Sequence, residues 1–205
     1  MTNRIFSTQR LPPGLRGAVE RGWRAGVVAL WCALAIGFTE VCILLVQQHV
    51  AGRFAWVARE FLWMTPLSYL FHLRWIIVVA VLLVTVWPRA PLHYIVVMPL
   101  LFVGAFAQLL GVQKLHLYAV VLISLGIAFQ LARLAGAHEA GFWRLVRRST
   151  PVLASLVVVL AAALPSIRAL REWRAYTTLP PAAAGAPNVL LIILDTVRAK
   201  SLSLY

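Results

Sequence analysis

The chain has 205 residues, of which 62% are hydrophobic and only 12% are charged, and its mean hydropathy is +0.87. This apolar share exceeds that of an ordinary globular domain, so we expect an integral membrane protein whose main partner is the lipid bilayer. The formal net charge of +13 does not indicate a nucleic-acid partner, because the arginines lie between apolar segments, where membrane topology and anionic headgroups account for them.

Five apolar stretches are each long enough to cross a bilayer core, which takes about 20 residues of helix. They cover residues 25–46, 66–87, 92–112, 116–135 and 151–170. The fifth is the weakest, because its uninterrupted apolar run stops at Pro165 and Arg168 follows, but the charged end of such a helix can reach the interface. The pattern predicts an all-α multi-span transmembrane helix bundle of about five helices over residues 25–173.

Two flanking segments have their own character. Residues 1–24 form a basic leader, which we place in the cytoplasm. Residues 53–64, between the first two spans, carry apolar side chains at helical spacing together with two tryptophans, which predicts a short helix at the membrane surface. This helix either packs simply at the interface or supports an external domain.

The arginines also predict an orientation. With five spans, the leader, Arg89 and the arginines between the fourth and fifth spans fall on one side, while the opposite loops carry Arg53, Arg59 and Lys114. The positive-inside rule places the more basic side in the cytoplasm. We therefore predict a multi-pass protein of the inner or plasma membrane, with residues 179–205 in the periplasm or outside the cell.

Glu40 is the only acidic residue within the five apolar cores. It lies toward the outer end of the first span, and His72 and Arg74 lie toward the outer end of the second. We interpret Glu40 and Arg74 as a structural intramembrane ion pair, because a proton or ion carrier typically has carboxylates on several helices. A transport role for Glu40 is the alternative.

The other polar and thiol side chains of the spans have simpler interpretations. Cys32 and Cys42 are expected to be small buried apolar side chains, forming neither a disulfide nor a metal pair. Gln108 and Gln130 are expected to form hydrogen bonds between helices.

The composition changes after the fifth span. Residues 174–187 become rich in Pro and Ala and are typical of a linker. Val189 to Leu194 is a run of six aliphatic residues, too short to cross a membrane and well suited to a buried parallel strand. Asp195 follows at the carboxyl end of this run, where open α/β sheets bind ligands and a carboxylate can hold a divalent cation.

The segment "PNVLLIILDTVRA" resembles the opening of the sulfatase family within the alkaline phosphatase superfamily, where a Pro-Asn pair leads into an aliphatic strand that ends in a metal-binding Asp. The whole arrangement looks like membrane-anchored sulfatase-like proteins. The resemblance covers only Pro187 to Tyr205, and Thr196 stands where many sulfatases have a second Asp, as it does in many membrane-anchored relatives. It implies that residues 188–205 are the truncated start of an external α/β catalytic domain.

The resemblance also implies a chemistry. Asp195 would be one ligand of a divalent metal, calcium in a sulfatase and zinc or manganese in a related phosphotransferase. The family nucleophile is expected beyond Tyr205, and one carboxylate cannot complete either kind of metal site, so this chain alone is not expected to be an active hydrolase. We therefore expect the membrane anchor of a metal-dependent hydrolase of sulfate or phosphate esters. A lipid-headgroup phosphotransferase and a stand-alone membrane scaffold or transporter are the alternatives.

Overall fold

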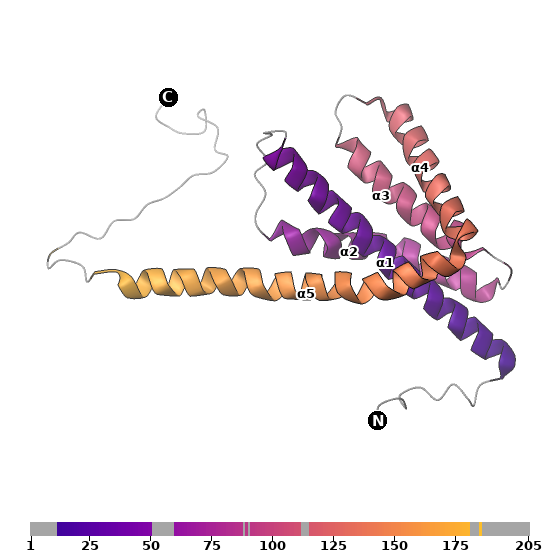
Figure 1. Cartoon of the computed structure of the whole chain (residues 1–205), viewed down its shortest axis with the longest axis horizontal. Coiled ribbons are helices and arrows are strands. Elements are labelled where there is room, and N and C mark those ends of the chain that lie inside the picture. Colours follow the sequence, from indigo (N-terminus) through magenta and orange to yellow (C-terminus); the bar gives the residue numbers. More distant parts are fainter. Residues whose placement is uncertain are drawn as a thin grey trace, which may run out of the picture. The chain divides into compact units, whose positions relative to one another are not determined.

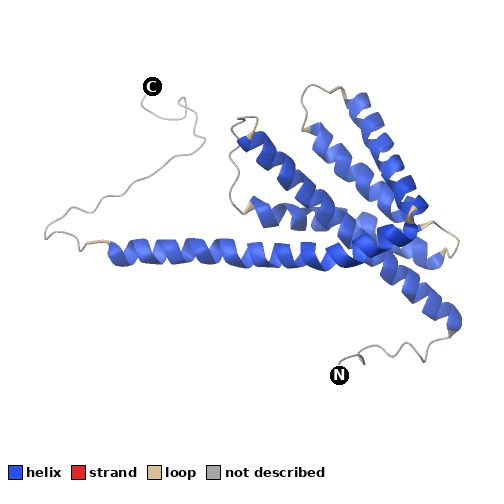
Figure 2. Ribbon diagram, in the orientation of Figure 1, coloured by secondary structure: helices blue, strands red, loops and turns tan. Residues whose placement is uncertain are grey.

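A computed structural model of the chain describes residues 12–50, 60–87, 89, 91–111, 115–180 and 185. The regular structure of these residues is entirely helical (Figure 2). The elements are α1 (Pro13–His49), α2 (Phe61–Val86), the π-helix η2 (His93–Val97), α3 (Met98–Leu110), α4 (Leu117–Ala137) and α5 (Glu139–Thr178) (Figure 1). The expected strand at Val189 to Leu194, and Asp195 with it, lies outside the described residues.

Five helical segments are long and apolar enough to cross a membrane, which confirms the predicted number and order of spans. They are Gly14–His49, Phe61–Val86, His93–Leu110, Leu117–Ala137 and Glu139–Thr178. The third span consists of η2 followed by α3, and Pro99 comes just after their junction. In a regular α-helix the ring of a proline would clash with a carbonyl group of the preceding turn. The wider π turn accommodates this proline without ending the span.

The helix ends differ from the expected boundaries. Because α1 begins at Pro13, half of the basic leader is helix continuous with the first span. Because α2 begins at Phe61, the last residues of the expected surface helix belong to the second span, while residues 53–59 lie outside the described residues. The structure therefore joins segments that the sequence analysis treated as separate.

α5 also runs further than expected in both directions. It starts at Glu139 instead of residue 151, passes through Pro151 and Pro165, and ends at Thr178 instead of residue 170, so residues 174–178 of the expected linker are helical. Within hydrocarbon, a proline that removes one hydrogen bond from a helix is tolerated, whereas irregular backbone would leave many polar groups unsatisfied. The need to satisfy the backbone therefore outweighs the local effect of the prolines.

α1 packs against α2 through a stripe of small residues. Ala25, Ala29, Ala33 and Gly37 recur at every fourth position of α1, and all are buried. At Gly37 the two backbones come so close that an added Cβ would lie 2.4 Å from the Cα of Pro66 in α2. Small residues at this spacing let transmembrane helices approach closely, which gives them extensive van der Waals contact.

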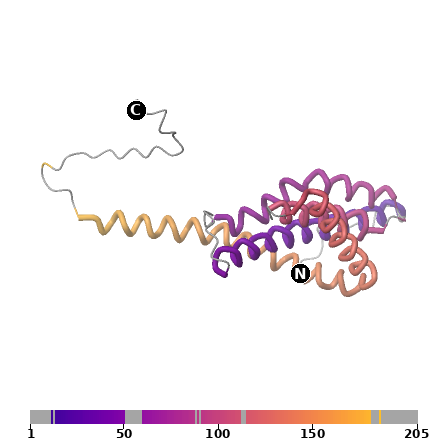
Figure 3. The backbone as a smooth tube through the Cα atoms, turned by 90° about the horizontal axis from the view of Figure 1, so that it is seen from above, coloured from indigo at the N-terminus to yellow at the C-terminus, as the bar shows by residue number. Residues whose placement is uncertain are grey.

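α3 and α4 form a second antiparallel pair, which runs side by side in Figures 1 and 3. The buried face of α4 again has residues at spacings of three to four, namely Val120, Ser124, Ala128, Ala132 and Ala135. In α3 the buried residues are Leu100 and Gly104, and Gly104 lies against Ile36 of α1, so these two residues pack toward α1. On α4 the small residues of the buried face allow the close approach of a neighbouring helix.

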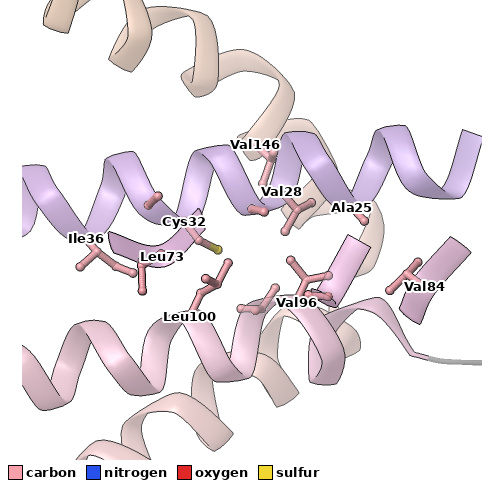
Figure 4. Close-up of a cluster of buried hydrophobic side chains, with 13 residues drawn as sticks. Ala25, Val28, Cys32, Ile36, Leu73, Val84, Val96, Leu100 and Val146 are labelled. Carbon is pink, nitrogen blue, oxygen red and sulfur yellow. The ribbon is translucent and has the colours of Figure 1, made fainter. Parts of the chain in front are cut away.

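The two pairs meet in a common apolar core around α1 (Figure 4). Cys32 and Ile36 of α1 lie beside Leu100 of α3, and Val146 of α5 approaches α1 from the other side. Cys32 is fully buried, as expected, whereas Cys42 is exposed, so the expectation of a buried side chain is wrong for Cys42. This packing belongs to the first of two compact units, residues 1–167, and residues 168–205 form the second.

Candidate functional site

The expected metal ligand, Asp195, lies outside the described residues, so its surroundings remain a prediction. Elsewhere in the chain, the described residues contain no group of three or more His, Cys, Asp or Glu side chains that could hold a metal ion. The functional geometry that the structure describes therefore consists of cavities between the helices.

Glu40 lines a cavity of about 640 Å³ between α1, α2 and α3. The lining residues are Glu40, Phe61, Met64, Thr65, Ser68, Tyr69, His72, Leu73, Val103 and Ala107. Tyr69 of α2 lies in the same lining, beside the Glu40 carboxylate. A phenol thus stands where the sequence analysis expected an arginine.

The expected ion pair of Glu40 with Arg74 is not formed. The Arg74 guanidinium donates to the carbonyl oxygen of Phe71 at 2.6 Å and lies over the ring of Phe71, 4.1 Å from its centroid. Leu73 is buried in the core, and the next residue points about 100° further round the helix, so Arg74 lies on an exposed face. A matching depth in the membrane was therefore not sufficient to predict an ion pair of Glu40 with Arg74, because Glu40 faces the cavity and Arg74 lies on an exposed face.

His72 does belong to the Glu40 cavity. Its Nδ1 lies 2.7 Å from the carbonyl oxygen of Ser68 and 3.1 Å from the Ser68 hydroxyl. The cavity wall therefore combines a carboxylate, a phenol, a hydroxyl and an imidazole with apolar side chains. Such a lining can hold a polar group at the membrane surface by hydrogen bonds, while the apolar part contacts a chain or ring.

A second polar cavity, of about 280 Å³, lies at the other end of the bundle. Its lining comes from all five spans and comprises Arg21, Arg24, Val28, Val84, Pro91, Leu92, His93, Ala135, Glu139, Phe142 and Trp143. Arg24 pairs with Glu20 at 2.9 Å and lies over the Trp143 ring, 5.7 Å from its centroid. The Nε of Arg21 is buried and has no hydrogen-bond partner.

The sequence analysis assigned these arginines to topology alone. The signal it missed is their spacing, because Arg21 and Arg24 are three residues apart and so share one face of a helix. His93 and Glu139 could not be associated with them from the sequence, since they come from other spans.

The third cavity is apolar, has a volume of about 560 Å³ and lies between α1, the third span, α4 and α5. Its residues are Trp31, Ala35, Ile36, Thr39, Val97, Leu101, Leu131, Leu134, Ala135, His138, Gly141, Phe142 and Leu145. Trp31 is fixed in the wall of this cavity by two contacts. Its indole Nε1 donates a hydrogen bond to the Ser149 hydroxyl at 2.7 Å, and its ring packs edge to face on Phe142 with the ring centroids 5.6 Å apart. These contacts tie the first part of α5 to α1.

Of the two glutamines in the spans, Gln108 forms the expected hydrogen bond between helices. Its Nε2 donates to the carbonyl oxygen of Ile36 at 3.2 Å, which confirms that prediction. Gln130 lies on an exposed face of α4.

Comparison of the chain with models of known protein families, with curated proteins and with solved structures finds no match. Any functional proposal therefore depends on the residues of this chain themselves.

Proposed function

We propose that this chain is the membrane anchor of a sulfatase-like, metal-dependent hydrolase of sulfate or phosphate esters. The observation that carries the proposal is the segment "PNVLLIILDTVRA", which follows five candidate membrane spans and a Pro/Ala-rich linker. In this proposal the segment begins a catalytic domain outside the cytoplasm, and the spans hold that domain at the membrane surface.

The arrangement of the helix ends supports the proposed topology. Arg21 near the start of α1, Val84 near the end of α2, His93 in η2, Ala135 near the end of α4 and Glu139 at the start of α5 all line one cavity. These ends meet there only if consecutive spans cross in alternating directions. A spanning α5 that starts at this end carries the chain to the opposite side, away from the amino terminus.

The metal site of the proposal includes Asp195 as one ligand among several. One carboxylate does not complete the six to eight oxygen ligands of calcium or the four ligands of zinc. Asp195 alone therefore does not make a complete site for either metal.

Reporter fusions test the topology. A reporter that becomes active only outside the cytoplasm, joined after Pro180, is expected to be active, whereas the same reporter after Arg89 or after His138 is expected to be inactive. Activity on the same side for the fusions after His138 and Pro180 would mean that α5 does not cross the membrane, and the proposal would fail.

The catalytic assignment is tested on the native product. An antibody against residues 1–24 is expected to detect a species much larger than 22.7 kDa in native membranes. In that species Asp195→Asn should lower both bound metal and ester hydrolysis, whereas Lys200→Gln should leave both near the starting level. A stable product of 22.7 kDa would instead favour a scaffold or transporter whose function lies in the spans.

A lipid-headgroup phosphotransferase is the second candidate. Two observations favour it, namely Thr196 in place of the second Asp of many sulfatases, and the polar cavity around Glu40, which suits a headgroup. Phospholipid with a radiolabelled headgroup distinguishes the two candidates, because a transferase passes the label to an acceptor and a hydrolase releases it to water. Glu40→Gln should slow transfer from lipid and leave hydrolysis of a soluble ester unchanged.

A further inference from the structure

The polar cavity at the Arg21 end and the apolar cavity beside Trp31 are neighbours. Both are lined by Ala135 of α4 and Phe142 of α5. One side of this shared wall faces two arginines, a histidine and a glutamate, and the other faces almost only hydrocarbon side chains. The two cavities together form a site with a cationic head and an apolar body.

The head of the site has an unsatisfied cationic donor. Arg24 is already paired with Glu20, but the buried Nε of Arg21 has no hydrogen-bond partner. A buried N–H without a partner is costly, and a guanidinium is shaped to bind two oxygens of a phosphate or carboxylate. An anionic oxygen in this cavity would therefore remove an existing penalty.

The charges around the head limit what it can hold. Arg24 is already neutralised by its ion pair with Glu20, so the guanidinium of Arg21 is the cation left to bind an anion, and Glu139 lies in the same lining. A phosphodiester carries a single negative charge and suits this arrangement. Inorganic phosphate and nucleotides carry more charge, and Glu139 would repel the excess.

The body of the site lies deeper in the bundle than the arginines. On α1 the residues that line the apolar cavity run from Trp31 to Thr39, roughly 10 to 22 Å of rise from Arg24 at 1.5 Å per residue. Half of a bilayer core is about 15 Å thick. The apolar cavity therefore lies at the depth that an acyl chain reaches when its headgroup is at the level of the arginines.

We propose that this site binds one phospholipid molecule, with its phosphate on Arg21 and Arg24 and one acyl chain in the apolar cavity. The unpartnered donor of the head and the depth of the apolar body point to the same ligand. The site lies at the end of the bundle opposite the Glu40 cavity, so it is independent of the proposed ester hydrolysis. A lipid bound there would stabilise the packing of α1, α4 and α5 in one leaflet.

Native mass spectrometry of the full chain in non-ionic detergent tests the proposal. After delipidation, the protein is titrated with dioleoyl phosphatidylglycerol, with dioleoylglycerol, which lacks the phosphate, and with oleate. We expect one tightly bound phosphatidylglycerol and binding of dioleoylglycerol that is weaker by about tenfold to a hundredfold, the effect of one or more charged hydrogen bonds. Equal binding of the two glycerolipids would overturn the proposal, as would oleate binding as tightly as phosphatidylglycerol.

Three variants locate the site. Arg21→Gln should weaken phosphatidylglycerol binding by about tenfold or more, and Ala35→Phe, which fills the apolar cavity, should also weaken it. Arg133→Gln, which removes an exposed arginine of α4 that lines neither cavity, is the matched control and should bind as the unaltered chain does. Equal losses in Arg21→Gln and Arg133→Gln would mean nonspecific attraction and would refute the site. The lipid comparison on the unaltered chain decides the question even if a variant fails to fold.

Discussion

Gly37→Ala tests whether close backbone contact holds α1 to α2. The new Cβ would lie 2.4 Å from the Cα and 3.0 Å from the N of Pro66, about 1 Å short of the 3.4 Å at which ordinary contact begins for the nearest atom. These are backbone atoms of a residue inside a helix, so no rotamer change can relieve the clash. The two helices must move apart, and we expect a loss of about 2–3 kcal/mol in the free energy of unfolding, at the upper end for overpacking.

Gly26→Ala is the matched control, because it lies on the same helix and an added Cβ there has nothing within 4 Å. Replacing an unconstrained helical glycine by alanine should stabilise the helix by about 0.5–1 kcal/mol. Both variants would be unfolded by SDS titration in mixed micelles and followed by circular dichroism. If Gly37→Ala proved as stable as Gly26→Ala, the close contact of α1 with Pro66 would be refuted.

Two further predictions concern the core around α1. Trp31→Phe keeps the aromatic packing but removes the indole donor to Ser149, so the same SDS titration should show a loss of about 0.5–1.5 kcal/mol, whereas exposed Trp75→Phe should change stability little. A maleimide added in detergent should label Cys42 first and Cys32 only after unfolding, because Cys32 is fully buried. Mass spectrometry counts the labels, and simultaneous labelling of both thiols in the folded protein would contradict the core packing.

The membrane spans were predictable because the signal is local. A helix that crosses hydrocarbon must be apolar over its whole length and satisfy its backbone internally, and both conditions can be assessed one segment at a time. The same local view placed the fifth span too narrowly, at residues 151–170, because charged residues lie on both sides of this apolar run. In the structure α5 continues to Thr178.

The small-residue stripe of α1, formed by Ala25, Ala29, Ala33 and Gly37, is present in the sequence at helical spacing, but the sequence analysis did not predict an interface there. The identity of the partner was not visible, because several spans could have faced that stripe. Likewise, Glu40 lines a cavity together with Tyr69, whereas Arg74 donates to the carbonyl oxygen of Phe71. A difference of a few positions turns a side chain to another face of the helix.

The sequence by itself determined that the chain has five apolar helices, where each lies and which residues are unusual within them, because hydropathy and helix periodicity act over a few turns. Only the tertiary structure decided which faces meet. The hydrogen bond of Trp31 to Ser149 and the cavity around Arg21 join residues from spans far apart in the chain. Such contacts depend on how whole helices pack, and packing is decided by the summed fit of many side chains, which no short segment of sequence contains.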